Sequence, residues 1–131
     1  MIYESGELTG LNTDKELEKF IQSHLPMTET AFYMLLSLQV PRHGYGIIKY
    51  VDELTEGRIK LGSGTIYGTI NKMIKSEIIE VYDDSDKKIV YVITDKGRAL
   101  LAAEKERILH LYRDSLTADD GSFGSSGGDE Q

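Results

Sequence analysis

The hydrophobic spacing of this 131-residue chain changes from a helical to a strand pattern near residue 77. Before that point, apolar residues recur three and four positions apart, which is the spacing of an amphipathic helix. After it, residues 78–82 and 89–93 are β-branched and aromatic runs, typical of strands, and the polar string DDSDKK separates them. The chain therefore predicts several helices followed by a β-hairpin with a charged tip.

Three short helices are predicted before the hairpin. Residues 28–39 are apolar on most sides and end before Pro41, which favours a buried helix. The second helix is indicated by apolar positions that recur at Ile47, Ile48, Val51 and Leu54, and Gly57 is a suitable terminator. The third lies within residues 61–75, with Ser63 as a suitable N-cap and a buried face formed by Ile66, Ile70, Met73 and Ile74.

A helix is also predicted at each end of this group. Residues 13–24 begin with a capping box, Thr13 to Glu16, and form a short amphipathic helix that Pro26 stops. Thr94 can cap a last helix from Asp95 to about Leu116, roughly 30 Å long at 1.5 Å per residue. This helix is too long for so small a core to cover, so its apolar stripe indicates a homodimer, in which residues 13–24 of the partner could take part.

The composition is that of one globular domain with acidic ends. The formal net charge is −7, yet residues 27–116 hold 13 Lys and Arg and 13 Asp and Glu, so the acidity belongs to the two ends. Residues 117–131 are rich in glycine and serine and are expected to be disordered. The chain has no cysteine and no apolar run long enough to span a bilayer, so we expect a cytoplasmic protein.

The order of the elements predicts an α+β fold, mostly α: a winged helix-turn-helix. Residues 1–26 would be an N-terminal extension, 27–94 the DNA-binding domain, and 95–116 a dimerisation helix. Three segments in register, HGYGII at 43–48, GTIY at 64–67 and YVITDKG at 91–97, resemble the PadR-like family of transcriptional regulators, and the resemblance covers about residues 28–116.

The resemblance implies a homodimeric repressor that binds a double-stranded, pseudo-palindromic DNA operator and is in some members released by a small aromatic or drug-like compound. It resembles the smaller members of the family, which have a single C-terminal helix. Three features differ from the usual pattern. Gly68 stands where a basic residue is frequent, Ser76-Glu77-Ile78 replaces an acidic-Gly-apolar ending, and the hairpin lacks a run of arginines.

The third helix carries the predicted DNA contacts on the side away from its apolar face. Lysines can reach phosphates or guanine edges, asparagine suits adenine, and threonine can contact phosphate or a thymine methyl group. At the hairpin, two lysines can meet phosphate, although Asp83, Asp84 and Asp86 lie beside them. The full predicted set is Ser63, Thr65, Tyr67, Gly68, Thr69, Asn71, Lys72, Lys75, Lys87 and Lys88.

Two of these residues have alternative interpretations. Tyr67 flanks the buried face, so packing is a more economical role for it than base contact. Gly68 should cost about 1 kcal/mol relative to alanine inside a helix. Close approach to DNA would explain the glycine. Crowding against the hairpin and neutral evolutionary drift are the alternative explanations.

No enzyme, metal or cofactor site is predicted. The glycines at 62, 64 and 68 miss the dinucleotide-binding spacing and lack the Lys-Ser/Thr of a P-loop, and His24, His43 and His110 have no metal-ligand spacing. His43 is expected to form a hydrogen bond in the turn before the second helix.

The competing functional class is a winged-helix module that binds another protein rather than DNA. A candidate effector cleft would be lined by Phe32, Tyr33, Leu36, Leu101, Ile108 and Tyr112.

Overall fold

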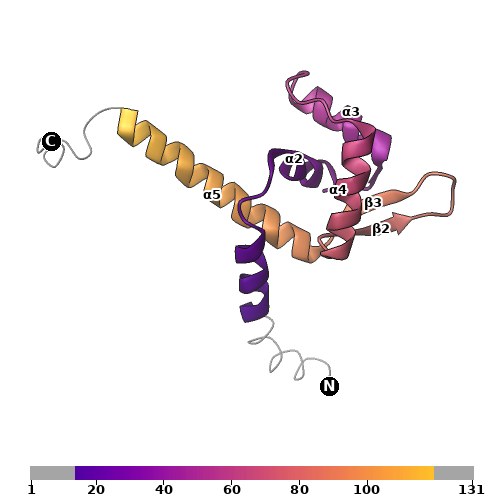
Figure 1. The fold of residues 1–131 in the computed structure, drawn as a ribbon, viewed down its shortest axis with the longest axis horizontal. Helices are drawn as coiled ribbons and strands as arrows, with labels where there is room; N and C mark the ends of the chain where they lie inside the picture. Colours follow the sequence, from indigo (N-terminus) through magenta and orange to yellow (C-terminus); the bar gives the residue numbers. More distant parts are fainter. Residues whose placement is uncertain (1–13, 120–131) are drawn as a thin grey trace, which may run out of the picture.

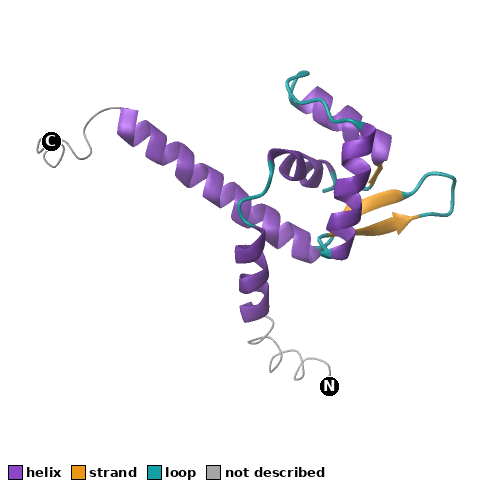
Figure 2. Cartoon of the chain, viewed as in Figure 1, coloured by secondary structure: helices purple, strands orange, loops and turns teal. Residues whose placement is uncertain are grey.

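The computed structural model describes residues 14–119. A helix over residues 14–24 precedes three short helices, α2 (Glu29–Ser37), α3 (Gly44–Leu54) and α4 (Ser63–Lys75), and a long helix, α5 (Asp95–Asp119), ends this part of the chain. Figures 1 and 2 show α2, α3, α4 and a small sheet gathered at one end of α5, which extends away from them. The arrangement confirms the predicted winged helix-turn-helix with a long C-terminal helix.

The sheet is antiparallel and contains one strand more than predicted. Its order is β1 (Arg42–His43), β3 (Val90–Ile93) and β2 (Ile79–Asp83), with Tyr91 paired to Arg42 on one side and to Val81 on the other. Strand β1 is only two residues long, too short to produce an alternating pattern in the sequence. It ties the segment between α2 and α3 to the hairpin, and so fixes the hairpin against the start of α3.

The hydrophobic core is built from every element of this group. Ile66, Ile70 and Met73 of α4 are at most 3% exposed, and Ile74 is partly buried, as the spacing predicts. They meet side chains of α2, α3, the sheet and the first turns of α5, among them Leu35, Leu38, Ile47, Val51, Ile79, Ile93 and Leu100. The apolar face of α4 is therefore covered within the domain, and its opposite face remains free.

Side-chain caps begin three of the helices. The Thr28 hydroxyl accepts from Ala31 N–H at 3.1 Å before α2, and Thr94 Oγ1 accepts from Gly97 N–H at 3.0 Å before α5. His43 Nδ1 accepts from Gly46 N–H at 3.3 Å, which confirms its expected role at the start of α3. The predicted Ser63 cap is wrong. Gly62 is the N-cap of α4, and no side chain in the described part of the chain caps that helix, because Ser63 already has helical geometry.

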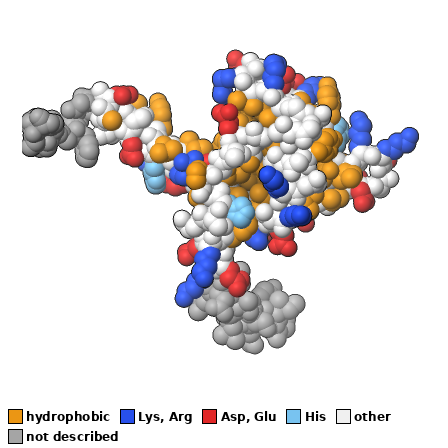
Figure 3. Space-filling model, viewed as in Figure 1, with side chains coloured by type: hydrophobic (Ala, Val, Ile, Leu, Met, Phe, Trp, Pro, Cys, Tyr) orange, Lys and Arg blue, Asp and Glu red, His pale blue; other side chains and the backbone are white. Residues whose placement is uncertain are grey.

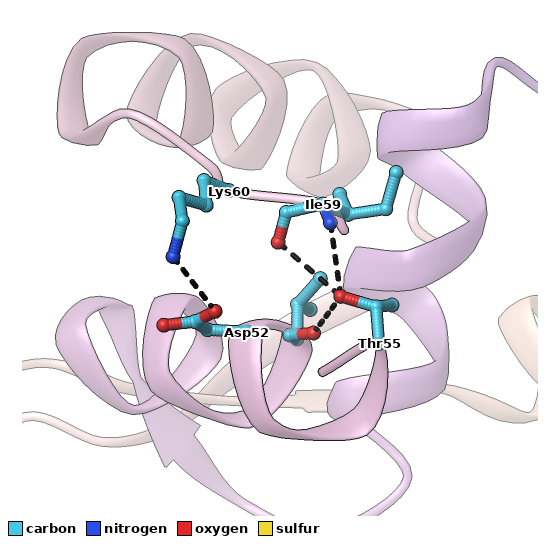
Figure 4. A network of polar contacts seen from close by, with 5 residues as sticks. Asp52, Thr55, Ile59 and Lys60 are labelled. Atoms are coloured by element: carbon cyan, nitrogen blue, oxygen red, sulfur yellow. Dashed lines mark hydrogen bonds and ion pairs between the residues drawn. The ribbon is translucent and has the colours of Figure 1, made fainter. Parts of the chain in front are cut away.

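The segment that joins α3 to α4 is held by Thr55 (Figure 4). The buried Thr55 hydroxyl donates to Val51 O at 2.8 Å and accepts from Ile59 N–H at 3.0 Å, so one side chain links the last turn of α3 to the following loop. Lys60 Nζ lies 3.1 Å from Asp52 Oδ1 and spans the same two segments. These contacts set the direction in which α4 enters the surface.

Helix α5 has a buried and an exposed half. Leu100 and Leu101 belong to the core, and Glu104 is also buried. Farther along, the apolar side chains stand in solvent: Ile108 and Leu109 are 38% exposed, and Leu111, Tyr112 and Leu116 range from 49 to 61%. The uncovered stripe that the sequence predicts is present.

Several predicted boundaries move. Helix α2 ends at Ser37, two residues before the predicted end, and α3 begins at Gly44, ahead of its apolar repeat. Helix α5 continues to Asp119, so the part of the expected disordered tail at 117–119 is helical. The rest of that tail and the capping residue Thr13 lie outside the described residues. No helix within residues 14–119 combines the length and the apolarity that a membrane crossing requires.

Candidate nucleic-acid interface

The outward face of α4 is polar and points away from the core of the domain. Tyr67 is 48% exposed, and Thr69 is half-buried at the edge of this face. The other predicted contact residues of the helix are all exposed: Ser63, Thr65, Gly68, Asn71, Lys72 and Lys75. The helical spacing thus predicted correctly that these residues lie on the exposed side of the helix. Their contacts with DNA stay a prediction.

Gly68 stands in open space on this face. Apart from its chain neighbours and the backbone of its own helix, a Cβ added to Gly68 would meet no atom of the described residues within 4 Å, and the same holds for Gly64 one turn earlier. Crowding against the hairpin therefore does not account for the glycine within this part of the chain. A larger side chain at position 68 would therefore point into solvent.

A shallow groove of about 340 Å³ runs along one edge of α4. Thr69 and Lys72 form part of its α4 wall, and the opposite wall comes from the end of the N-terminal helix and the start of α2, including His24, Met27 and Thr28. Lys72 is therefore close to the N-terminal segment, whereas Lys75 does not line this groove. The two lysines that the sequence treats as a pair have different surroundings.

The hairpin carries both charge types. Lys87 and Lys88 are exposed and line a pocket of about 270 Å³ together with Tyr67 of α4. They also border an adjoining groove that contains Asp83 and Asp86. The backbone N–H of Ser85 donates to Asp83 Oδ1 at 2.9 Å and lowers the pKa of this exposed carboxyl group, which keeps it ionised. The tip of the hairpin is thus acidic on one side.

Basic groups are scattered on the face drawn in Figure 3, where Lys and Arg form separate patches rather than a continuous surface. Such a distribution favours a few phosphate contacts over broad electrostatic attraction, because counterion release scales with the number of phosphates that are neutralised.

Two tyrosines beside this surface are not among the predicted contact residues. Tyr45 is 65% exposed in the first turn of α3, and Tyr91 lines the same pocket as Tyr67. Both lie in the family-like segments 43–48 and 91–97. A tyrosine in a strand is usually interpreted as a core residue, so the pattern alone gave no reason to single out Tyr91.

The six residues of the candidate effector cleft lie at different depths. Leu101 is in the core, and Phe32, Tyr33 and Leu36 are partly buried around it, with the Tyr33 hydroxyl accepting from Arg58 Nη2 at 3.2 Å. Ile108 and Tyr112 are exposed on the free half of α5. A cleft that includes all six would need a further surface over α5.

Three packed helices, an exposed polar third helix and an antiparallel hairpin beside it define a winged helix-turn-helix protein. Residues 34–103 match the transcriptional regulator PadR-like family. The chain belongs to this family. Family membership also confirms that the protein is a transcriptional regulator and not an enzyme.

Similar proteins agree with this assignment. An uncharacterised protein of Lysinibacillus sphaericus is 28% identical over 73% of this chain and 94% of its own length. The transcriptional regulator YqjI of Escherichia coli is 27% identical over half of this chain, but the match spans only 32% of YqjI.

Two solved structures have the same fold. A PadR-like transcriptional regulator of Bacillus cereus superposes with a TM-score of 0.54 at 20% identity, covering 72% of this chain and 96% of its own. The transcriptional repressor CouR, bound to a 23-mer DNA duplex, superposes with a TM-score of 0.58 at 22% identity, covering 99% of this chain and 91% of its own. Both likenesses concern the fold.

Proposed function

We propose that this protein is a dimeric transcriptional repressor that binds a double-stranded DNA operator, with α4 in the major groove and the hairpin against the adjacent backbone. The observation that carries the proposal is the free polar face of α4, on the side opposite Ile66, Ile70 and Met73, which are buried in the core. A helix held in this way can enter the groove without exposing the core. The CouR structure, a repressor with this fold on duplex DNA, supports the mode of binding.

Each residue type on this face suits one part of a DNA site. Lys72 and Lys75 supply positive charge to phosphates or guanine edges, and Asn71 presents an amide to adenine. Thr65 and Thr69 flank the glycine line, and Lys87 and Lys88 contact the backbone from the hairpin. Because few basic residues are involved, we expect α4 to dominate the salt dependence of binding.

The dimer would use the free half of α5. The stripe of Ile108, Leu109, Leu111, Tyr112 and Leu116 covers about two turns of helix on which no described residue packs closely. A two-fold contact between two such stripes buries apolar surface on both copies and holds two α4 helices for the two half-sites of an operator.

Effector release is part of the same proposal. In the dimer, the partner's α5 would supply the missing surface over Ile108 and Tyr112. A small aromatic compound bound in such a cleft would change the spacing of the two α4 helices and so weaken operator binding.

The test of DNA binding is a gel shift with an operator selected from random DNA, at two salt concentrations. Lys72→Ala plus Lys75→Ala should weaken binding. The slope of log binding constant against log salt concentration should become less steep by about one for each phosphate that is no longer neutralised. Arg98→Ala plus Lys105→Ala, which removes two exposed charges from α5, is the matched control and should bind as the wild type does. If the wild-type protein gives no shift at low salt, DNA binding is refuted and a protein-binding module becomes the better interpretation.

A further inference from the structure

A pocket of about 270 Å³ lies where the hairpin meets the start of α3 and the first half of α4. The lysines Lys87 and Lys88 line it, and no Asp or Glu of residues 14–119 does. The nearby carboxylates Asp83 and Asp86 line the adjoining groove instead. The pocket therefore has a positive electrostatic bias. The remaining lining residues are His43, Gly44, Tyr45, Tyr67, Ile89 and Tyr91.

Tyrosine hydroxyls supply the neutral donors of this pocket. Tyr91 has 6% of its surface exposed, and it lines the pocket. Among residues 14–119, the Tyr33 hydroxyl is the only tyrosine hydroxyl that forms a hydrogen bond within the chain, so the hydroxyls of Tyr67 and Tyr91 lack partners there. Burial, and then the neighbouring Tyr67, raise the pKa of Tyr91, which keeps its hydroxyl protonated as a donor. The ring of Tyr91 is buried, whereas its hydroxyl is open to the pocket and free to donate to a group bound there.

Helix α3 starts at the same pocket. Its first residue is Gly44, and the positive end of an 11-residue helix favours an anion. A Cβ at Gly44 would collide with the Tyr67 hydroxyl and lie 2.7 Å from Cζ of that ring. The glycine therefore allows the Tyr67 hydroxyl to lie directly against the beginning of α3.

From this arrangement we infer that the pocket binds a single phosphate group, held by hydroxyl donation from Tyr67 and Tyr91 and by the ammonium groups of Lys87 and Lys88. The inference deepens the proposed function, on which it rests, when the phosphate belongs to the backbone of operator DNA. It adds Tyr91, a core residue of the hairpin, to the groups that position the DNA. Free inorganic phosphate offers the same chemistry, and the experiment distinguishes the two sources.

The DNA arm measures operator affinity by fluorescence anisotropy. Tyr91→Phe removes one hydroxyl and leaves the ring in the core, and loss of a hydrogen bond to a charged group should weaken binding about tenfold without altering sequence preference. Tyr67→Phe should act in the same direction. Tyr82→Phe is the control, because Tyr82 is 64% exposed on β2 and does not line the pocket. Replacing the contacted phosphate by an uncharged methylphosphonate should remove the difference between Tyr91→Phe and the wild type.

The second arm is an NMR titration with inorganic phosphate at constant ionic strength, following the amide signals of Gly44 and Tyr45. Saturable shifts that are absent in Tyr91→Phe identify free phosphate as a ligand of the pocket. Weakened operator binding without such shifts assigns the site to the DNA backbone. If Tyr67→Phe and Tyr91→Phe bind operator as the wild type does and phosphate shifts neither amide, the inference is overturned.

Failure of this inference is separable from failure of the proposed function. The proposed function stands when the wild type binds DNA and depends on Lys72 and Lys75, even if the pocket variants behave as the wild type. If the wild type does not bind DNA, the phosphate titration still decides whether the pocket is an anion site.

Discussion

The buried Glu104 carboxylate accepts two hydrogen bonds from the Arg107 guanidinium one helical turn away, at 2.7 Å from Nε and 2.8 Å from Nη2. Its Oε2 atom also accepts from the backbone N–H of Met27 at 3.3 Å. One carboxylate thus fastens the segment between the N-terminal helix and α2 onto α5. Because that segment forms a wall of the groove beside Lys72, the contact joins the long helix to the candidate DNA surface.

Glu104→Gln should destabilise the fold by about 1 to 3 kcal/mol at pH 7, the cost of weakening charged hydrogen bonds to a buried group. Hydrogen bonding to Arg107 lowers the pKa of Glu104, and burial opposes that effect. Because the pKa of Glu104 is lower in the folded protein than in the unfolded chain, its ionised form stabilises the fold. This stabilisation is present above the unfolded-state pKa of about 4.3 and is lost as the pH falls through the folded-state pKa. The difference from wild type in urea unfolding should therefore shrink below about pH 4.

The control for this prediction is Glu106→Gln on the same helix, whose side chain is 65% exposed and should change stability by less than about 0.5 kcal/mol. A difference between Glu104→Gln and wild type that is the same at about pH 7 and about pH 3 would exclude the charged contact as its cause.

Glu77→Gly should stabilise the protein by about 1 kcal/mol. Glu77 has a φ of 64° at the end of α4, where its N–H donates to Ile74 O at 2.9 Å and Ile78 N–H donates to Met73 O at 3.0 Å. This is the helix ending that normally uses glycine. Glu77→Ala is the matched variant. Like the glycine variant, it loses the exposed contact of 3.5 Å between Glu77 Oε1 and Lys96 Nζ. Unlike the glycine variant, it keeps a side chain at a positive φ, so only Glu77→Gly should raise the melting temperature.

Gly68→Ala should raise the free energy of unfolding by up to about 1 kcal/mol, because the added methyl group meets nothing in the described part of the domain. We expect operator affinity to fall at the same time, because in the proposed complex this face of α4 lies against the DNA. Ala102→Gly on the exposed side of α5 calibrates the helix effect and should leave DNA binding unchanged. Unchanged or stronger operator binding by Gly68→Ala would show that close approach is not the reason for this glycine.

Leu111→Glu should prevent formation of the proposed dimer and weaken operator binding strongly, because it introduces a charge into the apolar stripe of α5. Analytical ultracentrifugation measures the oligomeric state. His110→Glu introduces a charge at the neighbouring position, where the side chain is 61% exposed beside Glu106 on the polar side of the helix, and should remain dimeric. A wild-type protein that sediments as a monomer at micromolar concentration would refute the proposed dimer.

Local patterns were sufficient to predict the order of the helices and the hairpin. The spacing of Ile66, Ile70 and Met73 orients α4, because only one face of a helix with that repeat can enter a core. Its opposite face follows by elimination, which is why the outward positions of Lys75 and Gly68 were predictable. The Thr94 cap was predictable for a similar reason, since capping involves residues only three positions apart. The Ser63 cap was wrong because glycine at 62 can also occupy the cap position.

Contacts between distant segments required the tertiary structure. Strand β1 exists only because Arg42 and His43 pair with a hairpin strand far along the chain. The partnership of Glu104 with Met27 and the meeting of Tyr67, Tyr91 and Lys88 around one pocket join segments whose spacing in the chain has no repeat. The spacing of apolar residues in the sequence indicates which face of its own helix or strand a residue occupies. The residues that it contacts from other elements depend on how those elements pack. The sequence was therefore enough to predict a helix suited to DNA, and packing alone determined the pocket beside it.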